Sequence, residues 1–183
     1  MKPLFTVHAG EYLTAEHIER RYPHLHVWVP TRDVGIDLLV TNPNSRKKLS
    51  LQVKYSKDFR VTHVAPALQP MLRACGWWTL RADKIAQSPA DYWVMVLYGL
   101  ARGSIDYIVI RPRELLARLQ RIHGRVERLQ TYLWTTESGL CWETRGLKKQ
   151  DRQGIADGSF REASRDFSQF LERWECLEKL SQA

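Results

Sequence analysis

Two apolar runs joined by a short polar segment constrain this chain more than any other feature. The runs cover residues 36–40 and 49–53, and the segment between them begins with residues 41–45, TNPNS. Proline fixes its own φ, and Asn and Ser bond their own backbone, so this composition indicates a turn. The two runs are therefore predicted to pair as the antiparallel strands of a hairpin.

Few polar side chains interrupt this hairpin, and they are placed to meet. Strand alternation puts Gln52 and Lys54 on the same face of the second run. Asp37 lies near the start of the partner strand, where a cross-strand or diagonal neighbour is within reach. A carboxylate between Ile36 and Leu38 is costly to bury unless it has a partner. The pattern predicts that an acid, an amide and an ammonium converge, and the alternative is an amphipathic hairpin with a solvated polar face.

Such a set of groups suits the hydrolysis of a phosphodiester. A hard divalent cation binds oxygen atoms of carboxylates, amides and backbone carbonyls. A lysine beside that cation can hold or activate a water, or stabilise the negative charge that develops on a phosphate.

The same residues resemble a known family. The segments GIDLLV (35–40) and QVK (52–54) are similar to the PD-(D/E)xK nuclease superfamily, in particular to its Mrr-like and Holliday-junction-resolvase-like members in an E-to-Q variant. The family pattern is an acid on the second strand, followed by acid-x-Lys on the third. This chain departs from the pattern at Ile36, where the name-giving motif has proline, and at Gln52, where it has the second acid.

The resemblance implies a divalent-metal-dependent DNA endonuclease that uses Mg²⁺ or Mn²⁺. It implies that Asp37 and Gln52 are metal ligands, that the Val53 carbonyl adds another, and that Lys54 orients or deprotonates the attacking water. An acid on the first helix often completes the site in this family, and Glu11 is the natural match. The glutamine keeps open a non-catalytic DNA-binding module with a decayed site, and an RNA-directed nuclease is a further alternative.

An apolar stripe at helical spacing predicts the first helix over residues 7–22. Glu11 lies in the centre of that stripe, where an unpaired carboxylate is costly to bury. A nearby cation or lysine would satisfy it, and the alternative is that Glu11 lies at the edge of the stripe and reaches solvent. Glu16 is the second candidate, but it lies well round the helix from the stripe.

The balance of charge favours a polyanionic partner. The formal net charge is +8, which suits DNA but can also serve solubility alone. Lys57 and Arg60 alternate with aromatic residues after the hairpin, a mixture that suits either a nucleic-acid backbone or a loop pinned to the core. Lys148 and Lys149 make the polar segment 145–158 basic, and this segment is predicted to be an exposed loop or linker.

The remaining pattern is typical of an α/β protein. Strands are expected at 25–30, 92–98, 105–110, 131–135 and 140–144, and further helices at 83–87, 113–122 and 159–183. This order predicts a restriction-endonuclease-like fold, in which a mixed central sheet is flanked by helices and followed by a C-terminal helical extension. We expect a nuclease-like core over 1–144 and a last helix over 159–183. That helix either packs on the core, which we favour, or offers the surface of a homodimer.

Several other classes of protein are disfavoured. The three cysteines are far apart and form no CxxC, so neither a disulfide framework nor a zinc knuckle is suggested, and a reducing cytosol fits best. The sequence shows no signal peptide and no transmembrane run, and a cytoplasmic location is expected. P-loop, HExxH, GxSxG and glycine-rich dinucleotide motifs are absent, which argues against the enzymes that they mark.

Overall fold

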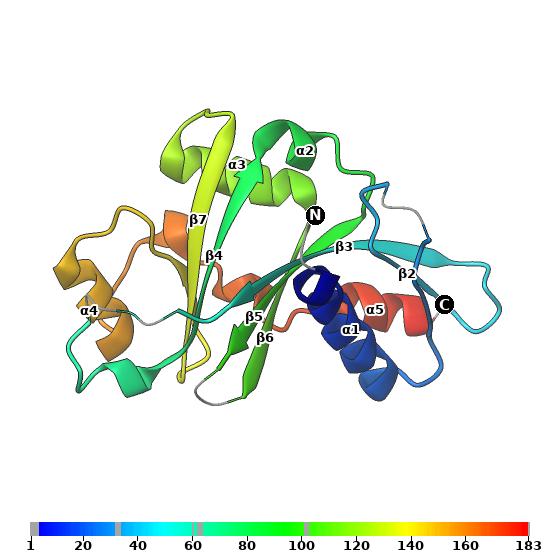
Figure 1. The fold of residues 1–183 in the computed structure, drawn as a ribbon, viewed down its shortest axis with the longest axis horizontal. Helices are drawn as coiled ribbons and strands as arrows, with labels where there is room; N and C mark the ends of the chain where they lie inside the picture. The colour runs from blue at the N-terminus through cyan, green and yellow to red at the C-terminus, as the bar shows by residue number, and fades with distance from the viewer. Residues whose placement is uncertain (1–3, 32–33, 60, 62–63, 101–102, 183) are drawn as a thin grey trace.

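The computed structural model describes residues 4–31, 34–59, 61, 64–100 and 103–182. Within these residues the chain forms a five-stranded mixed sheet and a three-stranded antiparallel sheet, and helices pack against both (Figure 1). The α/β class predicted from the sequence, with helices flanking a mixed sheet, is thereby confirmed. None of the helices in this part of the chain is long and apolar enough to cross a membrane.

The larger sheet has the strand order β1-β2-β3-β5-β6. Its strands are β1 (His26–Trp28), β2 (Leu38–Thr41), β3 (Lys48–Lys57), β5 (Tyr92–Gly99) and β6 (Ser104–Ile110). The first three pair antiparallel, whereas β5 runs parallel to β3 and antiparallel to β6. A parallel pair needs a long crossover, and here it contains the turn η1 (Gln69–Met71), strand β4 (Leu72–Arg81) and helix α2 (Ala82–Ala86).

One face of this sheet is covered by α1 (Leu4–Arg21) and α5 (Glu175–Ser181). Ile18 of α1, Leu51 of β3 and Leu177 of α5 are fully buried together in the core between these layers. Helix α1 approaches β3 closely at Gly10, where an added Cβ would lie 2.7 Å from the Cβ of Tyr55. The first helix predicted from the sequence is confirmed, and its glycine allows it to lie directly on the strand.

The smaller sheet consists of β4, β7 (Arg128–Thr136) and β8 (Cys141–Glu143), in the order β4-β7-β8. Its inner face and helix α3 (Pro112–His123) enclose a second core with the opposite face of the large sheet, and Trp78, Leu119 and Leu133 are buried there. Strand β4 alternates buried and exposed residues along most of its length. The strands expected from the sequence do not include this one.

The segment expected to be an exposed loop contains a helix, so that prediction is wrong. Residues Lys149–Asp157 form α4, whose N-terminus is capped by an N–H of Lys148 that donates to the Asp151 carboxylate at 3.1 Å. Ile155 is buried against Trp142 in a small third core. The segment is mostly polar and has only a short apolar face, so its composition did not indicate a helix.

The single C-terminal helix predicted over 159–183 is also wrong in extent. Only α5 is α-helical, and it is preceded by two short 3₁₀ turns, η2 (Ala163–Arg165) and η3 (Ser168–Phe170). Phe167 is buried in the core between the two sheets, whereas Trp174 is buried in the core under α1. The segment therefore packs on the body of the protein, as favoured, and a homodimer stays a prediction.

Candidate active site

The predicted hairpin forms and places Asp37 at its open end. The N–H of Asp37 donates to the carbonyl of Leu51 at 2.8 Å, and strand β2 begins at the next residue. The N–H of Val53 donates to Oδ2 of Asp37 at 2.7 Å. The carboxylate therefore takes the place of a backbone partner just before β2 begins. This contact holds the acid beside the residue that separates Gln52 from Lys54.

Gln52 and Lys54 lie on one face of β3 and line a cavity of about 690 Å³. Trp93 of β5 is the register partner of Gln52 and forms part of the same wall. The Nζ atom of Lys54 lies 5.4 Å from the centroid of the Trp93 ring, within range of a cation–π contact. The ammonium is thus held over an aromatic surface and faces the cavity.

A short chain of hydrogen bonds orients the glutamine. The indole N–H of Trp93 donates to Oγ of Ser88 at 2.8 Å. The Ser88 hydroxyl in turn donates to Oε1 of Gln52 at 3.4 Å. Reasoning from the sequence missed Ser88 and Trp93, because they are distant along the chain and reach β3 only through the parallel β3–β5 pairing.

The lining of this cavity includes two cations, and we call this part of the lining the basic rim. Arg81 and Lys84 line it, together with the polar side chains of Thr79 and Gln87. Arg81 also forms an ion pair with Asp83 at 2.6 Å, so part of its charge is balanced within the chain. The cavity therefore combines two groups suited to chemistry with two further cations, a combination that fits an anionic ligand.

Glu11 is half-buried on α1, next to the close approach at Gly10. Helix α1 covers the face of β3 that carries Val53 and Tyr55, which is opposite to the face of Lys54. Glu11 does not line the cavity that contains Gln52 and Lys54. Its role as a ligand stays a prediction, and any such role requires it to act around the open end of β2, where Asp37 lies.

The residues predicted to bind nucleic acid do not gather in one place. Lys57 is exposed at the end of β3, three positions beyond Lys54. Lys148 and Lys149 are exposed at the start of α4, on the opposite side of the molecule from β2 (Figure 1). Arg60 lies outside the described residues. Contacts of these residues with nucleic acid stay predictions.

The described residues contain no group of three or more His, Cys, Asp or Glu side chains that could hold a metal ion. The predicted ligands are instead the carboxylate of Asp37, the amide oxygen of Gln52 and the carbonyl of Val53, and of these three residues only Gln52 lines the cavity. All three are oxygen ligands, which are the type that a hard divalent cation takes. The set fits Mg²⁺ or Mn²⁺ in chemistry, although it carries less negative charge than two acids would.

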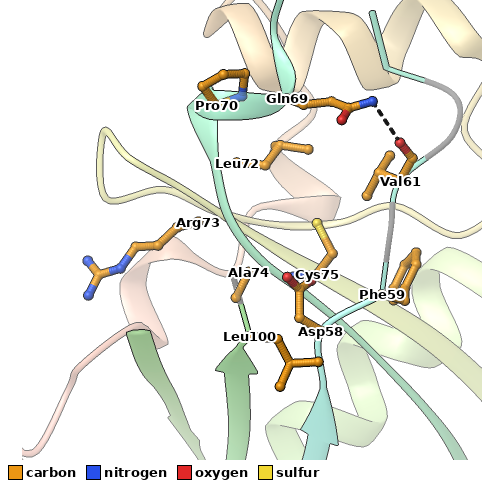
Figure 2. A pocket seen from close by; sticks show the side chains of 10 residues that line it. All are labelled: Asp58, Phe59, Val61, Gln69, Pro70, Leu72, Arg73, Ala74, Cys75 and Leu100. Atoms are coloured by element: carbon orange, nitrogen blue, oxygen red, sulfur yellow. Dashed lines mark hydrogen bonds between the residues drawn. The ribbon is translucent and has the colours of Figure 1, made fainter. Parts of the chain in front are cut away.

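A second cavity, of about 410 Å³, lies under the segment that follows β3 (Figure 2). Its carboxylate, Asp58, accepts a hydrogen bond from the N–H of Cys75 at 2.9 Å. Burial, with a smaller effect of Asp58, raises the pKa of the Cys75 thiol well above its ordinary value, which disfavours the reactive thiolate form. Arg73 points away from the other residues in Figure 2. The polar groups here serve the fold, and the hairpin cavity is the better candidate.

Comparison with solved structures finds a bacterial homing endonuclease. The match is to I-Ssp6803I, with a TM-score of 0.50 and 12% sequence identity, and it covers 98% of this chain and 95% of that chain. At this identity the likeness shows the fold alone, which is that of a known nuclease. No protein-family model matches the chain, and no curated protein matches it. Membership of the PD-(D/E)xK superfamily stays a prediction.

Proposed function

We propose that this protein is a divalent-metal-dependent DNA endonuclease that hydrolyses phosphodiester bonds. One observation carries the proposal. The Asp37 carboxylate accepts a hydrogen bond from Val53, and the residues on either side of Val53, Gln52 and Lys54, line one cavity with a basic rim. The endonuclease with a similar fold adds support, because its chain matches this one over nearly its whole length.

Each predicted site residue has a proposed role. Asp37, the amide oxygen of Gln52 and the carbonyl of Val53 would hold Mg²⁺ or Mn²⁺, and Glu11 would complete the set. A bound divalent cation supplies Lewis acidity at the phosphate and neutralises charge in the transition state. Lys54 orients or deprotonates the attacking water.

Two neighbours position these groups in the proposed mechanism. Trp93 would position the Lys54 ammonium through a cation–π contact, since Nζ lies 5.4 Å from the centroid of its ring. Ser88 directs a hydrogen bond to Oε1 of Gln52, which leaves the second lone pair of that oxygen for a cation. The basic rim formed by Arg81 and Lys84 would draw the phosphate backbone to this wall.

The experiment that tests the function is Lys54→Ala. Because Lys54 is assigned to the water and not to binding, plasmid cleavage with Mg²⁺ or Mn²⁺ should fall by about 10²–10⁴-fold. Affinity for the same DNA without divalent metal should stay within about twofold, since one charge among many is lost. The matched control is Lys47→Ala, which removes an exposed lysine from the β2–β3 turn.

Retention of cleavage by Lys54→Ala would contradict the assignment. A wild-type protein that binds duplex DNA but does not cut it with either metal would favour the non-catalytic module, for which the replacement of an acid by Gln52 is the specific support. Cleavage of a parallel RNA substrate in preference to DNA would favour the RNA-directed nuclease.

A further inference from the structure

The two-stranded ribbon formed by β4 and β7 has one face that is covered over only half its length. Cys75 of β4 and its partner Trp134 of β7 are buried on this face under Val61 and Ile155, which come from the segment after β3 and from α4. Further along β4, Trp77 lies on the same face and is 52% exposed. Among the described residues, Phe59 covers part of this second half, with its ring 6.1 Å from that of Tyr132, and the half is otherwise open.

The open half carries three cross-strand pairs of polar and aromatic residues. Side chains directly opposite each other in an antiparallel ladder lie on one face, so each pair points the same way. The pairs are Trp77 with Tyr132, Thr79 with Gln130, and Arg81 with Arg128. All six side chains are exposed or half-exposed. We call these six residues the ribbon surface.

The end of the ribbon surface places like charges together. Arg81 and Arg128 are direct partners in the ladder, and like charges in this position destabilise a sheet. Asp83 reduces the repulsion between the two arginines in part, because its carboxylate accepts hydrogen bonds from Nε and Nη2 of Arg81 at 3.0 and 2.6 Å. A polyanion bound to the ribbon surface would reduce this repulsion further, since guanidinium groups bind phosphate and base edges well.

The ribbon surface is continuous with the candidate active site. Thr79 and Arg81 line the same cavity as Gln52 and Lys54. The opposite face of the ribbon packs on α3 through Leu129 and Leu133, so the strands are held rigidly (Figure 1). A long ligand on the ribbon surface would therefore extend directly into the cavity.

We propose that the ribbon surface contacts duplex DNA and lies in its major groove, an inference that rests on the proposed endonuclease function. The major groove admits a two-stranded β-ribbon, and arginine, glutamine and threonine are side chains that read base edges there. Trp, Tyr and Arg are also common at protein interfaces. The opposed arginines, the net charge of +8 and the shared cavity favour DNA over a second copy of the chain.

The test compares binding by two double variants of identical composition. Arg128→Ala with Gln130→Ala removes one arginine and one glutamine from the ribbon surface, and Arg113→Ala with Gln120→Ala removes the same types from α3. Binding to a mixed-sequence duplex of about 30 base pairs, close to three helical turns, is measured by fluorescence anisotropy without divalent metal. Trp77→Ser is an independent variant on the other strand.

We expect Kd for the duplex to rise by about tenfold or more in Arg128→Ala/Gln130→Ala. The slope of log Kd against log salt concentration should fall by about one, because one fewer counterion is released on binding. The α3 double variant should stay within about twofold of wild type in the same assay. Trp77→Ser should also weaken duplex binding. Thermal melting of each variant verifies that the exposed substitutions leave the fold intact.

Unchanged duplex affinity in both ribbon variants would overturn the inference, as would an equal loss of binding to a single-stranded oligonucleotide of the same length. A wild-type dimer that Trp77→Ser dissociates, without loss of DNA binding, would assign the surface to a second copy and also overturn it. Because the assay contains no divalent metal, it is independent of cleavage. If the ribbon variants lose duplex binding but wild type does not cleave DNA with Mg²⁺ or Mn²⁺, the endonuclease function is refuted and the ribbon surface stands. If wild type does not bind duplex DNA at all, both proposals are refuted.

Discussion

At the scale of single residues, Asp37 serves the backbone as well as the proposed chemistry. Its carboxylate accepts the hydrogen bond of the Val53 N–H just before β2 begins. This explains why an acid is tolerated between apolar neighbours, because a buried polar group is costly only when it lacks a partner. Replacing Asp37 would disturb the hairpin and the proposed metal site together, so Lys54 gives the cleaner test.

His17 provides a residue-scale prediction about pH. Its ring lies 4.6 Å from Tyr107 and 4.9 Å from Trp174, and Nε2 is buried with no hydrogen-bond partner among the described residues. Burial, and then the charges of Arg21 and Arg20, lower the pKa of His17 from its ordinary value of 6.5. The folded protein therefore binds this proton less tightly than the unfolded chain does.

A lowered histidine pKa makes the folded state less stable as pH falls below the unfolded value of 6.5. The free energy of unfolding of wild type should decrease between about pH 7 and pH 5 more than that of His17→Gln, which has no proton to gain there. Denaturant unfolding of both proteins across this range measures the difference. Parallel curves would show that His17 does not titrate in this way.

At the scale of elements, the contact between α1 and β3 positions the first helix against the hairpin. Gly10→Ala tests it, because the new Cβ would lie 2.7 Å from the Cβ of Tyr55. Alanine improves helix propensity by about 1 kcal/mol, whereas overpacking costs about 1–3 kcal/mol. The cost of overpacking should exceed the gain in helix propensity, because both the Cβ of Tyr55 and its strand are fixed by the core.

We therefore expect Gly10→Ala to lower the free energy of unfolding by about 1 kcal/mol, with helix α1 displaced from β3. Chemical denaturation measures this change. The control is Gly154→Ala in α4, where the added Cβ would meet a movable hydroxyl, Oγ of Ser159, at 3.1 Å. A stabilised Gly10→Ala would show that α1 has room to shift.

At the scale of the whole molecule, the C-terminal segment joins both main cores to each other. Phe167 fills the core between the sheets, and Trp174 fills the core under α1. Arg165 adds an ion pair at 2.6 Å to Glu143, which is fully buried and also contacts His123 at 3.0 Å. Removal of this segment would leave two cores open and one acid with less compensation.

Truncation after residue 158 should therefore abolish the cooperative melting transition, because breaking a buried ion pair alone costs about 3–5 kcal/mol, a large part of the stability of a domain. Removal of only residues 182–183 should lower the melting temperature far less, because it costs α5 only the C-cap hydrogen bond of the Gln182 N–H. Calorimetry compares the two proteins with wild type. A well-folded 1–158 fragment would show that the segment is an independent appendage.

The sequence alone determined the hairpin, the first helix, the buried strands β5 and β6, and the joint placement of Gln52 and Lys54 on one face of β3. These features follow from local periodicity, because alternation and helical spacing depend only on neighbours along the chain. Tertiary structure decided the rest: the long strand β4, helix α4, the division of the C-terminal aromatics between two cores, and the placement of Ser88 and Trp93 beside the site. Each depends on partners far away in sequence, and no local pattern records which distant surface a short apolar face will meet.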